Sequence, residues 1–282
     1  MPERVIVKDS AHVPLDKKAS RKIILGPRKK GGLVDAESNK AGKTWLCADF
    51  PLMGYQEAWD LQVDLVAARK SRLVPEDVLL LMEHPPVFTM GRRGGRENLL
   101  VSEVFLQESG IPILHVERGG DITFHGPGQL VGYPIVDLHA GQWGVAGYVE
   151  RLEEVMIRTA AHWGVCATRN PLNHGIWVGN SKLGSIGIAV RCGIAFHGFA
   201  FNVNVSLEPF GWINPCGLQG IGMTSLKHEL SQTLSMSRVR EQLRHNFEAV
   251  FEMKLALTDP ASLRCILMRP PEKKEYIHHE IT

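Results

Sequence analysis

Hydrophobic positions recur at helical spacing in three separate parts of the chain. Between Gln56 and Lys70, apolar residues return every three or four positions with polar residues between them. This period is typical of a helix that packs one face against a core. The same spacing predicts a second helix from about Gly147 to Trp163 and a last helix that carries Val239, Leu243, Phe247 and Val250.

Short apolar runs, bounded by glycine, proline and turn residues, predict strands between these helices. Two of the runs are joined by Gly179-Asn180-Ser181, which predicts a tight hairpin. Because strands dominate the middle of the chain and helices flank them, we expect an α+β fold. The expected architecture is a single domain, roughly 45–260, with a mixed central β-sheet flanked by helices. The strand-like runs lie at 77–84, 111–117, 130–138, 175–178, 182–190 and 195–205.

The two ends of the chain differ from this patterned middle. Of the 32 Lys and Arg, 11 fall within residues 1–44, together with 5 of the 30 Asp and Glu. That segment therefore carries a net charge of +6 and the rest of the chain −4. With no sustained apolar period, residues 1–44 are expected to form a flexible basic extension. Residues 261–282 are expected to be a C-terminal tail, and the negative balance of the remainder argues against a nucleic-acid partner.

Composition narrows the class of protein. The chain has 282 residues, of which 44% are hydrophobic and 22% charged, as in ordinary globular domains. It contains no apolar run of membrane-spanning length and no secretory signal pattern, so we expect a cytoplasmic protein without membrane contact. The five cysteines form no CxxC pair, which predicts neither a disulfide framework nor a metal site.

Cys216 is the cysteine with a context that suits chemistry. It lies in the sequence Ile213-Asn214-Pro215-Cys216-Gly217, where proline and glycine predict a tight turn. A nucleophilic cysteine needs exposure and a nearby cation or base that favours the thiolate. Cys166 and Cys192 lie in apolar segments, and we expect both to be small buried hydrophobic residues with a structural role.

Lys182 is the candidate to activate such a thiol. It follows the hairpin turn and begins an apolar strand in which Gly184 and Gly187 leave room for a ligand near the backbone. A lysine at a strand end is usually solvated, but one held against this surface could take the thiol proton or stabilise the thiolate. Two histidines leave Cys/His catalysis open as an alternative: His125, and His197, which we expect to be a hydrogen-bonded core residue.

The stretch Arg118–Gln129, RGGDITFHGPGQ, is rich in turn residues. Gly119 and Gly120 could present backbone N–H groups to a carbonyl or carboxylate oxygen. Arg118 could bind an anion or pair with Glu117 or Asp121. On these residues alone, the stretch predicts a turn and gives only weak evidence for ligand binding.

Four motifs in order, RGGDITFHGPGQ, SKLGSIG, FHGFAFNVN and NPCG, resemble those of the octanoyltransferases over roughly residues 45–260. The resemblance implies a fold similar to the catalytic domains of biotin and lipoate protein ligases. It implies transfer of an octanoyl group from octanoyl-acyl carrier protein to a lysine of lipoyl domains, without a cofactor. The acceptors would be the E2 subunits of 2-oxoacid dehydrogenases and the glycine cleavage H protein.

The resemblance also assigns roles to residues. It makes Cys216 the nucleophile that carries the acyl group as a thioester, and Lys182 the residue that lowers the thiol pKa and transfers protons. The residues that it implies for acyl binding are Arg118, Gly119, Gly120, Asp121, Ile122, Thr123, Phe124, His125, Ser185, Ile186, Gly187, Gly198, Phe199 and Ala200.

Two other functions stay open on the sequence. One is an ATP-dependent lipoate or biotin protein ligase on the same scaffold, which would need no cysteine. The other is a non-catalytic acyl-binding protein, although Lys182 and Cys216 argue against it. Both macromolecular substrates of the family are typically acidic, and the arginine-rich segment 91–96 offers either a basic docking loop or an ordinary solvated loop.

Overall fold

The computed structural model describes residues 43–171, 173–215 and 220–268. The expected basic extension, apart from its last two residues, therefore lies outside the described residues. So do Cys216 and most of the expected C-terminal tail.

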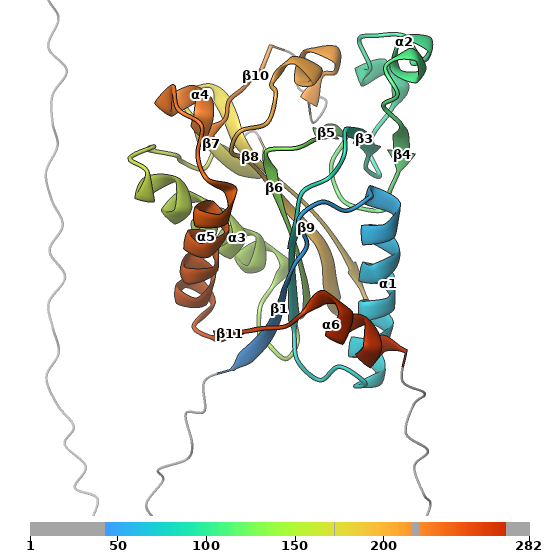
Figure 1. The fold of residues 1–282 in the computed structure, drawn as a ribbon, viewed down its shortest axis with the longest axis vertical. Coiled ribbons are helices and arrows are strands. Elements are labelled where there is room, and N and C mark those ends of the chain that lie inside the picture. The colour runs from blue at the N-terminus through green and yellow to red at the C-terminus, as the bar shows by residue number, and fades with distance from the viewer. Residues whose placement is uncertain (1–42, 172, 216–219, 269–282) are drawn as a thin grey trace, which may run out of the picture. The chain divides into compact units, whose positions relative to one another are not determined.

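The central sheet is mixed, as the sequence predicts (Figure 1). Its strand order is β10-β8-β9-β6-β2-β1-β11, and β7 pairs with the outer part of β8. The strands from β2 through β6 and β9 to β8 run antiparallel, whereas β1 pairs in parallel with both β2 and β11. The strand bounds are β1 Thr44–Asp49, β2 Val78–Met82, β6 Gln129–Asp137, β7 Gly175–Val178, β8 Ser181–Arg191, β9 Ile194–Asn202, β10 Gly222–Met223 and β11 Lys254–Leu257.

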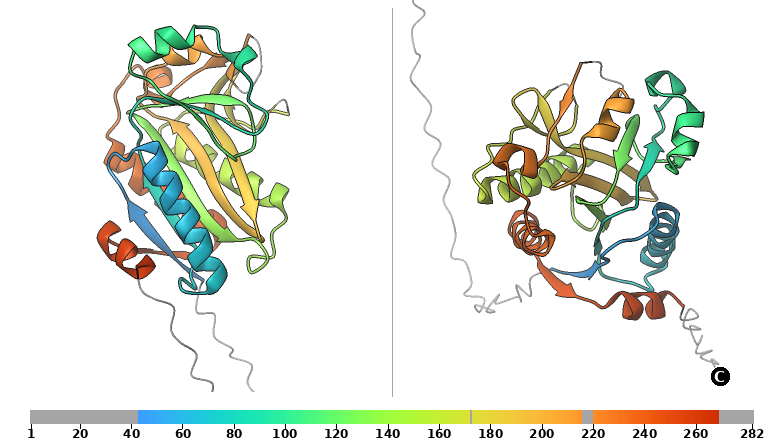
Figure 2. Two further views of the ribbon diagram at one scale, coloured as in Figure 1. Left: turned by 90° about the vertical axis from the view of Figure 1, so that its right-hand side faces the viewer. Right: turned by 45° about the horizontal axis from the view of Figure 1, so that its top comes forward.

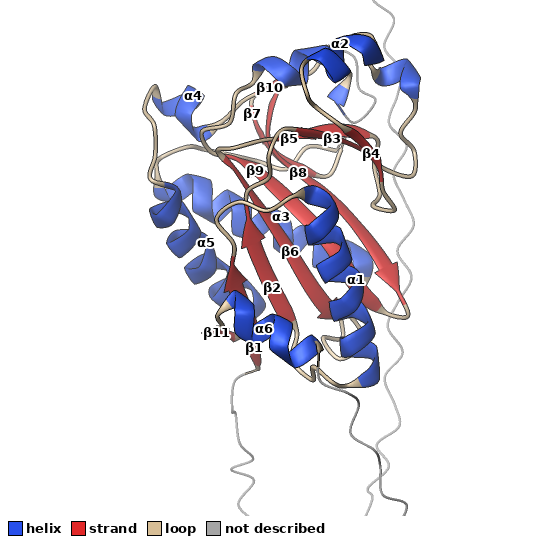
Figure 3. Cartoon of the chain, turned by 45° about the vertical axis from the view of Figure 1, so that its right-hand side comes forward, coloured by secondary structure: helices blue, strands red, loops and turns tan. Residues whose placement is uncertain are grey.

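Helices cover both faces of this sheet (Figure 3). The first and last helices, α1 (Tyr55–Ser71) and α6 (Pro260–Leu267), pack on one face over a core of their own. The two long helices α3 (Val145–His162) and α5 (Met236–Phe251) pack on the other face. Their buried sides carry the periodic apolar residues, which confirms the three helices expected from the pattern.

A smaller sheet lies across one end of the large one (Figure 2). It has the order β4-β3-β5, with β3 at Val87–Met90, β4 at Ile113–His115 and β5 at Ile122–His125. A third core cluster, which includes Phe88, Phe124 and Phe210, joins it to the 3-10 helix η2. The remaining short elements are η1 (Arg96–Asn98), α2 (Glu103–Glu108), η2 (Glu208–Trp212) and α4 (Leu226–Leu230).

The folded unit extends beyond residue 260, where we expected it to end. Asp259 caps α6 by accepting a hydrogen bond from the backbone of Ser262 at 3.0 Å. Leu263 of this helix is fully buried against the core under α1. The apolar residues of 260–267 are thus part of the domain. None of the helices in the described part of the chain is long and apolar enough to cross a membrane.

Candidate active site

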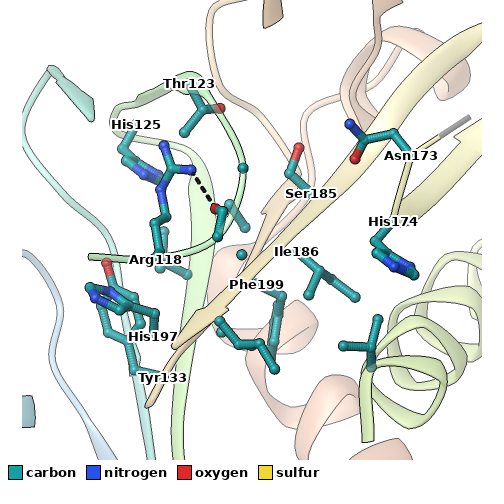
Figure 4. A pocket seen from close by; sticks show the side chains of 18 of the residues that line it. Arg118, Thr123, His125, Tyr133, Asn173, His174, Ser185, Ile186, His197 and Phe199 are labelled. Atoms are coloured by element: carbon teal, nitrogen blue, oxygen red, sulfur yellow. Dashed lines mark hydrogen bonds between the residues drawn. The ribbon is translucent and has the colours of Figure 1, made fainter. Parts of the chain in front are cut away.

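A cavity of about 230 Å³ lies beside β8, between the two sheets and the start of α3 (Figure 4). Much of its wall is apolar, with Val145 and Val149 from α3, Ile186 from β8 and Phe199 from β9. Ligand pockets for drug-sized molecules commonly measure about 300–1,000 Å³. This cavity is smaller, and it suits a short, mostly apolar group.

Glycines create the space for the cavity and for the backbone around it. Gly187 of β8 lies directly opposite Gly198 of β9. A Cβ atom at Gly187 would lie 2.9 Å from the carbonyl oxygen of Gly119, and one at Gly198 only 2.2 Å from that of Gly132. Side chains at these two positions would therefore collide with neighbouring backbone.

The cavity brings together residues that are far apart in the sequence. Most of the residues that the resemblance assigns to acyl binding line its wall. Three of the assigned residues, Asp121, Ile122 and Phe124, do not. The residues that do line it are Arg118, Gly119, Gly120, Thr123, His125, Ser185, Ile186, Gly187, Gly198, Phe199 and Ala200.

The alternation of β5 explains why Ile122 and Phe124 are elsewhere. Successive side chains of a strand point to opposite faces. Thr123 and His125 face the cavity, whereas Ile122 and Phe124 pack into the core cluster of the smaller sheet. The sequence interpretation treated this stretch as a turn, but it forms a buried strand between two glycine-rich ends.

Asp121 has an anchoring position instead. Its carboxylate accepts a hydrogen bond from the Asn98 side chain at 2.7 Å, and the Asn98 carbonyl accepts one from the backbone N–H of Asn214 at 2.8 Å. Asp121 thereby ties the RGGDITFH stretch to the segment that leads into Cys216.

Lys182 is buried, with 1% of its surface exposed. Its Nζ donates a hydrogen bond to Asn173 Oδ1 at 3.0 Å and lies 5.4 Å from the centre of the Trp177 ring. A Cβ atom at Gly175 would lie 2.9 Å from Lys182 Cε, so a side chain at this position would crowd the aliphatic part of the lysine side chain. The structure places this lysine inside the protein, unlike the solvated lysine that is usual at a strand end.

The loop before β7 brings Asn173 to Lys182. Glu153 of α3 is buried, and its carboxylate accepts hydrogen bonds from the backbone of Gly175 at 2.9 Å and from Arg169 Nε at 3.1 Å. Asn173 lies between these two anchors and also lines the cavity. Asn173 was not predicted as a site residue, because an asparagine in a loop two positions before a glycine resembles an ordinary turn residue.

A directed chain of hydrogen bonds holds Arg118 and His125. Arg118 donates to the Thr89 carbonyl at 2.7 Å and to Thr89 Oγ1 at 2.9 Å. His125 Nδ1 contacts Gln129 Oε1 at 2.7 Å, and because an amide oxygen only accepts, Nδ1 carries the proton. His125 Nε2 then accepts from the Thr89 hydroxyl at 3.3 Å. Both ring nitrogens of His125 are therefore engaged.

Burial, with smaller effects from the nearby His84 and Arg118, lowers the pKa of His125 well below the ordinary histidine value. His125 is neutral at pH 7, and its only lone pair is directed at a hydroxyl. This arrangement argues against His125 as the base in Cys/His catalysis.

The Gly-Gly backbone is only partly available to a ligand. The N–H of Gly119 donates to the carbonyl of Ile188 at 2.9 Å and so extends the edge of the large sheet. The expectation that this N–H faces a substrate oxygen is therefore wrong. Of the two acidic neighbours considered as partners of Arg118, Glu117 instead forms an ion pair with Arg191 at 2.9 Å.

His197 differs from its expected role as a hydrogen-bonded core residue. It is buried, at 1% exposure, but neither ring nitrogen has a hydrogen-bond partner among the described residues. Its backbone φ of +56° is left-handed, and its ring stacks on the preceding Phe196 with centroids 5.0 Å apart. Burial, then the charge of Arg118, lowers the pKa of His197 to about 3.

The cysteine expectations were partly wrong. Cys166 and Cys192 are exposed rather than buried. Cys192 forms the turn between β8 and β9 with a φ of +53°. Cys166 lies after α3 as the exposed residue between the buried Val165 and Ala167. Cys47, in contrast, is buried in β1, and burial raises the pKa of its thiol to about 12.

Within the described ranges, no three His, Cys, Asp or Glu side chains gather closely enough to hold a metal ion. The polar groups that line the cavity include Asn173 at one end and Arg118 with the buried histidines at the other (Figure 4). Lys182 does not itself line the cavity and is linked to it through its hydrogen bond to Asn173.

The chain is similar to a known protein family. The model of the lipoyl protein ligase A/B catalytic domain matches residues 54–248. An octanoyltransferase of Desulfotalea psychrophila is 49% identical over 197 residues, which cover 69% of this chain and 88% of that protein. An octanoyltransferase of Caldicellulosiruptor bescii is 46% identical over 203 residues, 71% of this chain and 89% of that protein.

Solved structures share the fold at low sequence identity. A lipoate-protein ligase A bound with ATP superposes with a TM-score of 0.63 at 15% identity, over 80% of this chain and 92% of that one. The bipartite lipoate protein ligase of Thermoplasma acidophilum gives a TM-score of 0.64 at 14% identity, over 80% and 91%. These likenesses confirm the expected fold.

Proposed function

The chain belongs to the octanoyltransferases of the lipoyl protein ligase A/B catalytic domain family, and from this premise we propose how its cavity serves transfer of an octanoyl group in protein lipoylation. The observation that carries the proposal is the buried Lys182, which is hydrogen-bonded to Asn173, a residue that lines one end of a small and largely apolar cavity. A buried amine beside an acyl site suits proton transfer during attack on a thioester.

In the first step, the thiolate of Cys216 attacks the carbonyl carbon of the octanoyl thioester on the donor. The attack forms the new S–C bond and a tetrahedral oxyanion. Collapse of this intermediate restores the carbonyl and breaks the bond to the carrier sulfur, and the carrier thiolate leaves and takes a proton. Lys182 favours the Cys216 thiolate, either by accepting the thiol proton or through its charge. One thioester replaces another, so the step needs no nucleotide to drive it.

In the second step, the amine of the acceptor lysine attacks the Cys216 thioester. Lys182 accepts a proton from this amine, the C–N bond forms, and the Cys216 sulfur leaves and is reprotonated. The product is an amide, which is more stable than the thioester. The free thiol is then ready for another donor.

The cavity wall contributes by binding the acyl chain and excluding water. Each methylene that leaves water contributes about 0.8 kcal/mol to binding. Val145, Val149 and Phe199 supply the apolar surface. Water in this space would hydrolyse the thioester between the two steps, so an acyl chain that displaces this water preserves the intermediate.

Residues before Cys216 support its place near this cavity. Asn214 is tied through Asn98 to Asp121, which directly follows the cavity-lining Gly120. The assigned residue Asp121 thus acts in the proposal as a positioning residue for the Cys216 segment.

The donor and acceptors are in general an acyl carrier protein and lipoyl domains, as the family implies. We propose more specifically that the acceptors are E2 subunits of 2-oxoacid dehydrogenases and the glycine cleavage H protein. Arg93 lines the cavity, and Arg92 and Arg96 are exposed on the same loop. This loop, residues 91–96, would attract acidic partners to the cavity mouth.

The ATP-dependent ligase remains the second candidate because a lipoate-protein ligase A bound with ATP shares the fold. At 15% identity that likeness concerns the fold alone. The 40–49% identity to octanoyltransferases favours transfer, as does the presence of Cys216.

Intact-mass spectrometry tests the proposed intermediate. We expect one octanoyl adduct after mixing with octanoyl-acyl carrier protein in the absence of ATP, and expect hydroxylamine to remove it. The adduct should be absent from Cys216→Ala and present in Cys192→Ala, which removes an exposed cysteine instead. An adduct that persists in Cys216→Ala, or ATP-dependent modification by an active Cys216→Ser variant, would overturn the proposal.

A further inference from the structure

One end of the cavity is polar, which a saturated octanoyl chain does not require. Figure 4 shows Arg118, His125, Tyr133 and His197 gathered at this end, away from Asn173. Arg118 and His125 take part in the hydrogen-bond chain described above. His197 is left with no hydrogen-bond partner among the described residues, and Tyr133 beside it uses its hydroxyl proton on His84.

His197 is unusual in two independent ways. Both of its ring nitrogens lack a partner among the described residues, although buried polar groups are nearly always hydrogen-bonded. Its left-handed φ of +56° is also rare outside glycine, and such conformations concentrate at functional sites.

The left-handed backbone re-aims the His197 side chain. In a regular strand, Phe196 and His197 would point to opposite faces of the sheet. Instead the two rings stack, and the His197 ring lies 6.4 Å from both Tyr133 and Trp59 of α1. The unusual conformation therefore brings an unpartnered imidazole to the cavity wall next to Tyr133.

Tyr133 completes the donor and acceptor pattern. His84 Nδ1 contacts the Met53 carbonyl at 2.7 Å, so Nδ1 carries the proton and Nε2 accepts from the Tyr133 hydroxyl at 2.8 Å. The Tyr133 hydroxyl is also hydrogen-bonded to the neighbouring Tyr55 hydroxyl. With its own proton on His84, the Tyr133 oxygen can only accept, and one lone pair remains for a ligand. A neutral His197 offers one donor and one acceptor. A hydroxyl group, which both donates and accepts, matches this pair.

The strand register gives the distance from the reactive end. Ser185 lies opposite Gly175, beside the Asn173 end, whereas Ile188 lies opposite His197. Three residues of a strand span about 10 Å. An extended eight-carbon chain, with seven C–C bonds of about 1.5 Å in a zigzag, is about 9 Å long. An acyl group with its carbonyl near Lys182 thus reaches His197 with its far end.

We propose that His197 and Tyr133 form a polar subsite that binds a hydroxyl group at the far end of an eight-carbon acyl chain. The subsite extends the substrate class from saturated octanoyl groups to chains that carry a terminal hydrogen-bonding oxygen. The inference rests on the proposed function, because the chain must lie with its carbonyl at Lys182.

Competition between two donors of equal size tests the subsite. Nonanoyl- and 8-hydroxyoctanoyl-acyl carrier protein differ by a methyl and a hydroxyl group at the same position. A purely apolar cavity end disfavours the hydroxyl, because burying it without a partner is costly. We expect the wild-type enzyme to reverse this order and to transfer the hydroxylated chain with a kcat/KM about tenfold higher than the nonanoyl chain.

Variants assign that preference to His197. His197→Phe should lose the reversal and favour the nonanoyl chain. His197→Asn should keep part of it, because asparagine tolerates left-handed backbone and retains both a donor and an acceptor. His115→Phe makes the same chemical change on an exposed strand residue and should leave the preference unchanged.

Two results would overturn the subsite: a wild-type preference for the nonanoyl chain, or an unchanged preference in His197→Phe. The wild-type measurement decides the matter even where a variant fails to fold. Octanoyl transfer in the same assay separates this inference from the proposed function. If octanoyl is transferred but the hydroxylated chain is disfavoured, only the subsite fails.

Discussion

At the scale of single residues, buried histidines that stay neutral are a recurring feature near the cavity. His84 is fully enclosed between the Met53 carbonyl and the Tyr133 hydroxyl. Burial lowers its pKa from about 6.5 to about 4. The imidazole is thus kept as a hydrogen-bonding group whose charged form the fold disfavours.

This lowered pKa predicts acid sensitivity. Between pH 6.5 and about 4, His84 is protonated in the unfolded chain but stays neutral in the folded protein. The free energy of unfolding therefore falls as the pH falls through this range. The slope from one such histidine approaches about 1.4 kcal/mol per pH unit. Denaturant unfolding of His84→Gln across this window should show a shallower slope than the wild type.

His115→Gln is the matched control for that measurement. His115 is exposed, and its removal should leave the pH dependence of unfolding unchanged. Equal slopes in His84→Gln and the wild type would show that His84 takes up its proton in the folded state as easily as in the unfolded chain.

At the scale of elements, the site depends on a loop whose position is set by a helix. Glu153 of α3 fixes the loop at Arg169 and Gly175, and the loop holds Asn173 against Lys182 of β8. The buried lysine of β8 therefore receives a hydrogen-bond partner from outside the sheet.

Replacement of Asn173 should change the chemistry more than substrate binding. Asn173→Ala removes an acceptor that helps to orient Lys182, and we expect kcat to fall roughly tenfold with a small change in KM. Asn173→Asp places a carboxylate beside the lysine and stabilises its charged form, so the pH–rate profile should move to higher pH.

Asn180, in the exposed turn between β7 and β8, provides the control. Asn180→Asp should leave both kcat and the pH–rate profile unchanged. If the pH–rate profile of Asn173→Asp also coincides with that of the wild type, Asn173 has no role in positioning the proton-transfer group.

Periodic elements could be predicted from the sequence, and elements set by tertiary context could not. Helices α1, α3 and α5 and the hairpin of β7 and β8 follow the apolar pattern closely. Strand β5 was missed because its four residues lie between two glycine-rich turns. Helix α6 was missed because its apolar residues follow a proline near the polar end of the chain.

The same limit applies to the cavity. The sequence motifs contain most of the residues that line the cavity. They did not indicate that alternation along β5 directs Ile122 and Phe124 into a hydrophobic core rather than into the cavity. The direction of the His197 side chain depends on a left-handed backbone that no local pattern indicates. Asn173 gains its importance only from contact with Lys182.

At the scale of the whole molecule, positive charge gathers near the cavity, although the chain after residue 44 is negative as a whole. The chain after residue 44 is net negative, but Arg92, Arg93 and Arg96 gather on one loop, and Arg93 reaches the cavity. An acidic carrier would be repelled by much of the domain and attracted at this loop.

Charge reversal at the loop should weaken the use of acidic donors. We expect Arg92→Glu/Arg96→Glu to raise KM for octanoyl-acyl carrier protein about tenfold at low salt, with the difference shrinking at high salt as screening increases. Steady-state kinetics over a range of salt concentrations measures this change. Lys70→Glu/Arg238→Glu, which makes the same total change of charge at exposed positions of α1 and α5, should have little effect. A salt-independent rise in KM would contradict electrostatic docking.

The parallel pair of β1 and β11 has a consequence for how the protein is made. The first strand of the folded unit is completed by nearly the last, so during synthesis β1 keeps one unpaired edge until residues 254–257 have been added. Unpaired edges readily join strands of other chains. Because β11 is itself the last strand in the sheet order, its addition replaces the six-residue edge of β1 with a four-residue edge that begins with Lys254. Short edge strands and lysine side chains both discourage pairing with other chains, so a chain released before residue 254 would expose the longer and less protected edge.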